Sequence, residues 1–188
     1  MTTIRLKGGR VYDPANGVDG EIRDISVVRL EQGKWTALTT AHNDGWHINA
    51  CPTNGPSLAA SGSRVAMSWF TGAGNVPRVK AAFSTNAGDR FTAPVIVDLG
   101  RPVGWPATVL LDDGSAVVSW LESKGEGRGD LLVRRVAPDG RLGAPTLVAQ
   151  SSSGRSTGIP QMLRVRDRLL LAWRTDRVQT ALVPVPGY

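Results

Sequence analysis

Two arginines stand at the same distance before a proline, and their type and spacing suggest an anion-binding site. Arg101 lies five residues before Pro106, and Arg155 lies five residues before Pro160. A guanidinium group grips a carboxylate through two parallel hydrogen bonds, so two equivalent arginines could converge on one anion. The alternative is that both are solvated loop arginines in an arginine-rich chain. Cys51 occupies the matching position of an earlier segment, so the pattern does not extend to a third copy.

The segment 42–56, HNDGWHINACPTNGP, holds the densest group of side chains that could bind a sugar. Its candidates are Asp44, Trp46, His47 and Asn54. Trp46 could stack on a sugar ring, and Asp44 could accept hydrogen bonds from the ring hydroxyls. The alternative is a well-ordered loop in which Trp46 fills a packing gap and Asn54 begins a turn.

Composition excludes several classes of function. The 188 residues are 41% hydrophobic and 20% charged, which indicates a folded domain. One cysteine and two histidines leave no multi-cysteine zinc site and little for a histidine site, so we expect no metal and no cofactor. The net charge is +6, but the arginines are scattered and aromatic residues are only 6%, so we expect no nucleic-acid partner. No apolar run reaches the roughly 18 residues of a membrane-spanning helix, so we expect no membrane partner.

The elements that would position these side chains are repeated along the chain. Three tryptophans are separated by 51 and 53 residues, and a proline precedes each of them by a similar distance. Between proline and tryptophan, each segment reads as an apolar strand, a polar turn and a second apolar strand, which predicts a β-hairpin. The three pairs are Pro56–Trp69, Pro106–Trp120 and Pro160–Trp173.

Further strands follow each tryptophan. Residues 78–84 read RVKAAFS and residues 130–136 read DLLVRRV, each followed by a turn and another apolar stretch, while 24–30 begins an earlier half-copy. Four short strands in about 50 residues are typical of a β-propeller blade. The sequence therefore predicts an all-β fold, a partial propeller or one of about four blades. The alternative is a repeated sandwich hairpin. We expect the blades near 25–50, 51–101, 102–154 and 155–188.

One turn carries a family resemblance. Residues 84–91, STNAGDRF, place a serine, an asparagine, a glycine and an aromatic residue at fixed spacings. In such a turn Asn86 caps backbone N–H groups, Gly88 takes a positive φ and Phe91 packs beneath. The pattern resembles the Asp-box, or BNR repeat, of bacterial sialidases, with Asn86 in place of the commoner aspartate. Together with the repeats, residues 25–188 look like a sialidase-like propeller. The resemblance implies that this turn is structural and distant from the axial site.

The N-terminus shows a different resemblance. Residues 6–21, LKGGRVYDPANGVDGE, resemble the start of the metal-dependent, amidohydrolase-like subunit of formylmethanofuran dehydrogenase. That chemistry would need metal-binding histidines and a barrel, and the chain has no His-x-His pair. We therefore expect residues 1–24 to be an N-terminal extension with an amidohydrolase-like sequence. A gene fusion, a gene-boundary artefact or a short shared stretch could each explain the join.

The sialidase resemblance implies a tyrosine nucleophile paired with a glutamate, an acid/base aspartate and three arginines that bind a sugar carboxylate. The two tyrosines, Tyr12 and Tyr188, lie in no matching motif. We therefore expect a non-catalytic propeller module that binds a glycan or another anionic ligand, such as an acidic sugar. The alternatives are a fragment of an exo-α-sialidase, or a formylmethanofuran dehydrogenase component by its N-terminus only.

The incomplete first and last copies leave two arrangements open. Their strands could complete one another and close a small ring, or the chain could be part of a larger, roughly six-bladed protein. In the second case, open blade edges would invite self-association. The first ten residues lack the apolar core of a signal peptide, whereas sialidase-like proteins are usually exported, so we expect export only if a longer precursor exists.

Overall fold

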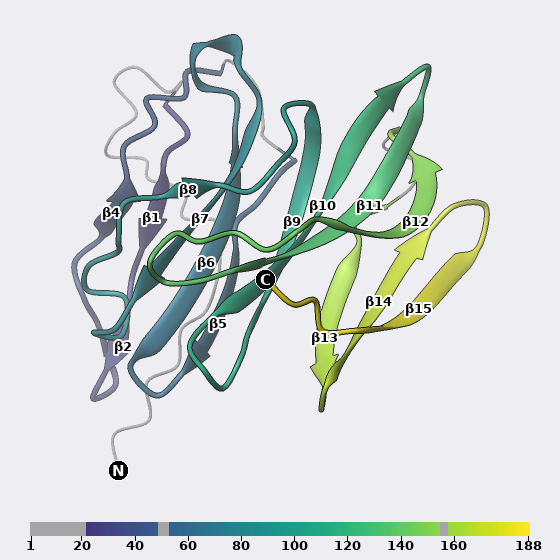
Figure 1. Cartoon of the computed structure of the whole chain (residues 1–188). Coiled ribbons are helices and arrows are strands. Elements are labelled where there is room, and N and C mark those ends of the chain that lie inside the picture. Colours follow the sequence, from purple (N-terminus) through teal and green to yellow (C-terminus); the bar gives the residue numbers. More distant parts are fainter. Residues whose placement is uncertain (1–21, 49–52, 155–157) are drawn as a thin grey trace.

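The computed structural model describes residues 22–48, 53–154 and 158–188. The described residues form β-strands and one short 3-10 turn at Ala73–Asn75, and no α-helix occurs among them. The predicted all-β fold is confirmed. Figure 1 shows the sheets standing side by side in one row that follows the chain, from β1 and β4 at one end to β13, β14 and β15 at the other.

Each sheet corresponds to one copy of the repeat. The second and third copies are four-stranded and antiparallel, the fourth has three strands, and the first contains two short strand pairs. We call these groups the first to fourth blades. The first blade has β1 (Ile25–Val27) with β4 (Thr39–His42) and β2 (Leu30–Glu31) with β3 (Lys34–Trp35). The second has β5 (Ser57–Ser61), β6 (Arg64–Thr71), β7 (Arg78–Ser84) and β8 (Val95–Ile96). The third has β9 (Pro102–Leu110), β10 (Ala116–Gly125), β11 (Arg128–Val136) and β12 (Thr146–Ser152). The fourth has β13 (Gln161–Val165), β14 (Arg168–Arg174) and β15 (Val178–Pro184).

The strand register reproduces the proline–tryptophan repeat. In the second, third and fourth blades, the residue after the proline lies opposite the residue before the tryptophan. These pairs are Ser57 with Ser68, Ala107 with Ser119, and Gln161 with Ala172. Each hairpin predicted between proline and tryptophan is present. A side chain in one blade therefore has a defined equivalent in the next.

The core lies between the blades. Side chains of a strand alternate between the two faces of its sheet, so each blade presents one apolar set to the preceding blade and another to the following blade. Trp120 and Val118 of the third blade pack against the second blade. Leu131 and Val133, also in the third blade, pack against Leu171 of the fourth. A smaller cluster joins the first and second blades.

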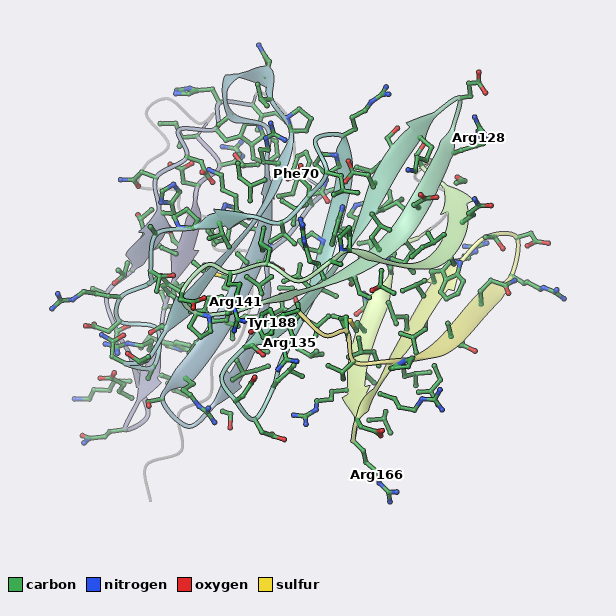
Figure 2. The ribbon with its side chains drawn as sticks, in the orientation of Figure 1. Phe70, Arg128, Arg135, Arg141, Arg166 and Tyr188 are labelled. Atoms are coloured by element: carbon green, nitrogen blue, oxygen red, sulfur yellow. The ribbon has the colours of Figure 1, made fainter. Side chains whose placement is uncertain are left out.

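The ends of the blades form two opposite surfaces. The loop face comprises the connections that enter the next blade, 43–48, 53–56 and 97–101, together with the turns 72–77, 126–127 and 175–177. The turn face comprises the hairpin turns 62–63, 111–115 and 166–167 with the loops 85–94 and 137–145. In Figure 2, Phe70 and Arg128 lie toward the loop face, while Arg135, Arg141, Arg166 and Tyr188 lie toward the turn face.

The incomplete blades do not complete one another among the described strands. β15 pairs only with β14, and β1 pairs only with β4, so no described strand of the first blade joins the sheet of the fourth. The described part is thus an open row of blades. Of the two arrangements predicted, it corresponds to the partial propeller and not to the closed ring.

Candidate functional site

The loop face between the second and third blades is shaped by a buried carboxylate, Glu122, at the end of β10. Its Oε1 accepts the backbone N–H of Arg101 at 2.6 Å, and its Oε2 accepts the indole N–H of Trp120 at 2.6 Å and the backbone N–H of Leu99 at 3.2 Å. Glu122 is only 3% exposed. Because an unpartnered buried carboxylate would be costly, these donors fix the course of the connection 97–101.

A second buried carboxylate holds the same connection from the other side. Asp98 accepts the backbone N–H groups of Val79 and Gly100, both at 2.7 Å, and an N–H of Arg78 at 3.1 Å. Gly100 has φ +110°, a conformation that an L side chain rarely adopts. The backbone that carries Arg101 is therefore fixed on both sides by buried acids.

Arg101 itself projects from this fixed backbone. The residue is exposed, and its carbonyl oxygen accepts the backbone N–H of Ser123 at 2.8 Å. No described residue pairs with its guanidinium group. A cation that is exposed and held on a rigid loop is suited to grip a carboxylate. Its predicted companion, Arg155, lies outside the described residues.

Asp44 lies in a buried cluster rather than at the surface. Its side chain is 2% exposed and accepts the indole N–H of Trp69 at 2.6 Å. The ammonium group of Lys80 is in direct contact with the same carboxylate, and Nε2 of His42 lies 3.5 Å from it. This arrangement joins the first blade to the second, and it occupies the oxygens that were expected to receive sugar hydroxyls.

Trp46 packs within the same joint. Its indole is 9% exposed and meets the ring of Phe70 edge-on, with 5.5 Å between ring centroids. Its backbone N–H donates to Asp24 at 3.2 Å. This is the packing arrangement that the sequence left open as the alternative to sugar stacking. His47 is exposed and forms an isolated bridge with Ile22 at the edge of the first blade.

Asn54 links the second blade to the innermost strand of the third. Its amide Nδ2 donates to the carbonyl of Val103 at 3.2 Å, and its Oδ1 accepts the backbone N–H of Trp105 at 2.5 Å. Trp105 has φ +51°, and its buried indole N–H has no hydrogen-bond partner. Asn54 therefore supports a strained stretch of β9.

The structure thus separates the predicted site residues. It brings Asp44 and Trp46 into the joint of the first two blades, places Asn54 at the next joint, and leaves Arg101 exposed. Sequence reasoning missed Glu122 and Asp98, the two acids that hold Arg101. Only the position of Glu122 two residues after the repeated tryptophan offers a signal, because that spacing puts the carboxylate on the same face as the indole.

On the turn face, the turn of residues 84–91 is closed by side-chain hydrogen bonds. Ser84 Oγ donates to Asn86 Oδ1 at 2.8 Å and accepts the backbone N–H of Gly88 at 2.9 Å. Asn86 Oδ1 also accepts the backbone N–H of Arg90 at 3.0 Å. Gly88 has φ +83°, and the ring of Phe91 lies beside it. A shallow groove of about 230 Å³ runs between this turn and residues 39–41.

Tyr188, the one tyrosine among the described residues, also lies on the turn face. The guanidinium carbon of Arg141 is 3.8 Å from its ring centroid and that of Arg135 is 4.6 Å away. Figure 2 labels the three residues close together. Arg135 is five residues along the paired strands from the level of Glu122, which is about 17 Å at the rise of a β-strand. Tyr188 is therefore remote from Arg101.

Two further acids of the turn face are exposed and paired with arginines. Both oxygens of Asp112 accept N–H groups of Arg164, at 2.9 and 2.7 Å, and these hydrogen bonds lower the pKa of Asp112. Hydrogen bonds from Ser115 lower the pKa of Asp113, which also pairs with Arg135. The first pair joins the turn 111–115 to β13 of the fourth blade, and the second lies within the third blade.

The described ranges contain no group of three or more histidine, cysteine, aspartate or glutamate residues placed to hold a metal ion. Within the same ranges, no helix has the length and apolar character needed to cross a membrane.

Comparison with solved structures supports the propeller fold. The chain is similar to the Hadza microbial sialidase Hz136, with a TM-score of 0.55 and 16% identity over 86% of this chain and 40% of that one. It is also similar to the GH43 BlXynB protein from Bacillus licheniformis, with a TM-score of 0.53 and 12% identity over 98% of this chain and 39% of that one. At these identities the likeness shows the fold alone, that of a glycoside hydrolase β-propeller. The chain spans about two fifths of the length of either structure.

No protein-family model matches the chain, and no curated protein matches it. Nothing in these comparisons supports the resemblance of the N-terminus to formylmethanofuran dehydrogenase. Nearly all of that segment lies outside the described residues.

Proposed function

We propose that the chain is a sialidase-like propeller module that binds an acidic glycan or another anionic ligand on its loop face without catalysing a reaction. Residues 25–188 form its blades, residues 1–24 are an N-terminal extension, and residues 84–91 are its Asp-box. The observation that carries the proposal is the exposed guanidinium of Arg101 on a backbone fixed by Glu122 and Asp98. Because the backbone at Arg101 is already held, binding a carboxylate there would need to order only the side chain. Arg155 is the second arginine of the proposed clamp.

Two observations support binding without catalysis. Tyr188 contacts two arginines on the turn face, no glutamate in the described part of the chain pairs with it, and it lies far from Arg101. Asp44 and Glu122 are buried, and both already accept indole N–H groups. Neither carboxylate is placed to exchange a proton with a ligand on the surface.

The experiment is a binding titration of the intact chain with sialyllactose and with glucuronic acid, by calorimetry or NMR. We expect Arg101→Ala to weaken binding at least tenfold, and Arg101→Lys to weaken it less because the charge remains while the bidentate geometry is lost. Arg166→Ala is the matched control, since it removes the same charge from the turn face. Equal affinity of Arg101→Ala and Arg166→Ala would overturn the arginine site.

A second candidate is an exo-α-sialidase-type glycoside hydrolase of which this chain is a part. The fold likeness to a sialidase favours it. A fluorogenic sialoside distinguishes the two candidates. Turnover by the purified chain that survives Arg166→Ala and disappears with Arg101→Ala would replace the binding proposal with the catalytic one.

A further inference from the structure

The groove on the turn face lies at the joint between the first and second blades. Residues 39–41 of β4 form one wall, and residues 88–91 of the second blade form the other. Arg29 of the first blade holds the two walls together. One of its guanidinium nitrogens lies 3.1 Å from Oδ1 of Asp89, and another donates to the carbonyl of Asn86 at 3.5 Å. The groove is therefore a feature of how the two blades meet.

The floor of the groove is apolar. Ala41 and Phe91 line it, and both are partly buried against the cluster that joins the first two blades. The backbone at Gly88 passes close above this floor, since a Cβ there would lie 3.8 Å from both the Phe91 ring and Val27. An apolar floor of this kind can pack against the C–H face of a sugar ring.

Two free polar groups stand above the floor, one on each wall. Thr39 is exposed and shares a strand face with Ala41, and its hydroxyl has no hydrogen-bond partner among the described residues. Arg90 is exposed on a held backbone, because its N–H donates to Asn86 Oδ1 at 3.0 Å. No described residue pairs with its guanidinium group. The acid of the same wall, Asp89, is already paired with the first blade.

The third blade provides an internal comparison for Arg90. Its equivalent there is Arg141, because each arginine stands two residues before the backbone N–H that closes its loop onto β7 or β11. The guanidinium of Arg141 is covered by the ring of Tyr188, with 3.8 Å between the guanidinium carbon and the ring centroid. Arg90 has no such cover among the described residues. The same turn position therefore holds one covered and one accessible arginine.

We propose that this groove binds a single sugar ring that carries a carboxylate, a hexuronate. Arg90 binds the carboxylate through two hydrogen bonds, Thr39 meets a ring hydroxyl, and the C–H face of the sugar packs on the apolar floor. The volume of about 230 Å³ lies below the roughly 300–1,000 Å³ of sites for larger ligands, so it suits one ring. The groove and Arg101 lie on opposite surfaces, so this proposal does not depend on the loop-face site.

The experiment is an NMR titration of the isotope-labelled intact chain with glucuronic acid. We expect the amide signals of Gly88 and Arg90 to shift and to saturate. Arg90→Ala, followed at Gly88, should weaken this binding at least tenfold because the carboxylate loses its bidentate partner. Thr39→Val should weaken it about fivefold because one hydrogen bond is lost. Arg141→Ala is the matched control, since it removes the same charge from the equivalent turn position and should leave the affinity of the groove unchanged.

Two simpler ligands test the two parts of the recognition. Glucose has the ring without the carboxylate, and acetate has the carboxylate without the ring. Each should bind the groove at least tenfold more weakly than glucuronic acid, because each makes only part of the contacts. Glucose binding as tightly would remove the role of Arg90 and overturn the proposal. Acetate binding as tightly would also overturn it, since an arginine that attracts any small anion recognises no sugar.

Site-resolved signals keep the groove separate from the loop face. The amides of Leu99 and Arg101 report the loop-face site, so a loss of shifts there in Arg101→Ala tests that site without affecting the groove. Glucuronic acid that leaves the signals of Gly88 and Arg90 unmoved would overturn the groove proposal. Equal affinities of Arg90→Ala and Arg141→Ala would do the same. Circular dichroism and a thermal melt check that each variant is folded.

Discussion

The joint between the second and third blades and the joint between the third and fourth are built on the same register but held in different ways. At the first joint, Ser68 and Thr108 share a buried hydrogen bond of 2.5 Å. At the second, Ser119 is the equivalent of Ser68, and the residue equivalent to Thr108 is Met162, so the buried hydroxyl of Ser119 has no partner. The repeat has kept the backbone geometry of the joint while its polar contacts have diverged.

The same contrast extends to the loop face. Asn54 crosses the first joint with two hydrogen bonds to β9, whereas no described residue crosses the second joint in this way. The second joint relies on apolar packing, through Met162, Leu169 and Leu171, and on an exposed ion pair between Arg164 and Asp112. Polar contacts specify how two blades meet and apolar contacts supply most of the free energy, so the second joint should be stabilised chiefly by its core.

The largest expected effect therefore comes from the core of the second joint. Leu171 is 0% exposed, and Leu171→Ala should lower the free energy of unfolding by about 2–5 kcal/mol because it leaves a cavity between the blades. Urea unfolding at low protein concentration measures this loss of unfolding free energy. Leu163→Ala, on the opposite face of the same hairpin, should lower the unfolding free energy far less. Equal losses for the two variants would mean that the second joint is not held by its core.

The next largest effect tests the polar side of the first joint. Asn54→Ala removes both hydrogen bonds to β9 and leaves the N–H of Trp105 and the carbonyl of Val103 unpaired, at a cost of about 2–4 kcal/mol in unfolding free energy. Asn43→Ala changes an exposed asparagine of the same connection and should have little effect. If Asn54→Ala were as mild as this control but weakened glycan binding, Asn54 would be a ligand residue, as the sequence suggested.

The sharpest test of the comparison is a pair of serines at equivalent positions. Ser68→Ala should cost about 1–2 kcal/mol in unfolding free energy because the hydroxyl of Thr108 loses its partner. Ser119→Ala removes a buried hydroxyl that has no partner, so it should be neutral or stabilising by up to about 1 kcal/mol. Chemical denaturation of both variants measures the difference. A loss of equal size at both positions would mean that the two joints are equivalent after all.

Much of the fold could be predicted from the sequence because its signals are local and repeated. Proline, turn and tryptophan recur within about 50 residues, and the hairpin between them depends only on nearby alternation. The turn at Ser84–Phe91 was likewise foreseeable, since the hydrogen bonds from Ser84 and Asn86 that close it join residues at most four positions apart.

The candidate site was less predictable because its contacts are not local. Asp44, in the connection after the first blade, reaches Trp69 and Lys80 in the second, and Asn54 reaches Val103 and Trp105 in the third. The sequence shows that these polar side chains are present, but only the packing of blades decides whether they face solvent or one another. The roles of Arg101 and Arg155 stay predictions.

The smallest expected effect concerns the exposed ion pair of the second joint. Hydrogen bonds from Arg164 lower the pKa of Asp112 in the folded chain. The folded state therefore binds the proton more weakly than the unfolded state. The stabilisation is present above the ordinary aspartate pKa of about 3.9 and disappears as pH falls through the lowered value. Arg164→Ala should lower the unfolding free energy slightly at pH 7, and the difference from the unmodified chain should shrink as the pH falls below the ordinary aspartate pKa.

Thermal melts between pH 2 and 7 measure this difference, and 1 M salt should reduce it at pH 7 because exposed charges are screened. Arg128→Ala provides the control, since its pair with Glu126 lies within one turn and joins no blades. A pH-independent loss for Arg164→Ala would mean that the arginine acts through packing of its side chain. The second joint would then owe its stability to apolar contacts alone, and the contrast with the first joint would be complete.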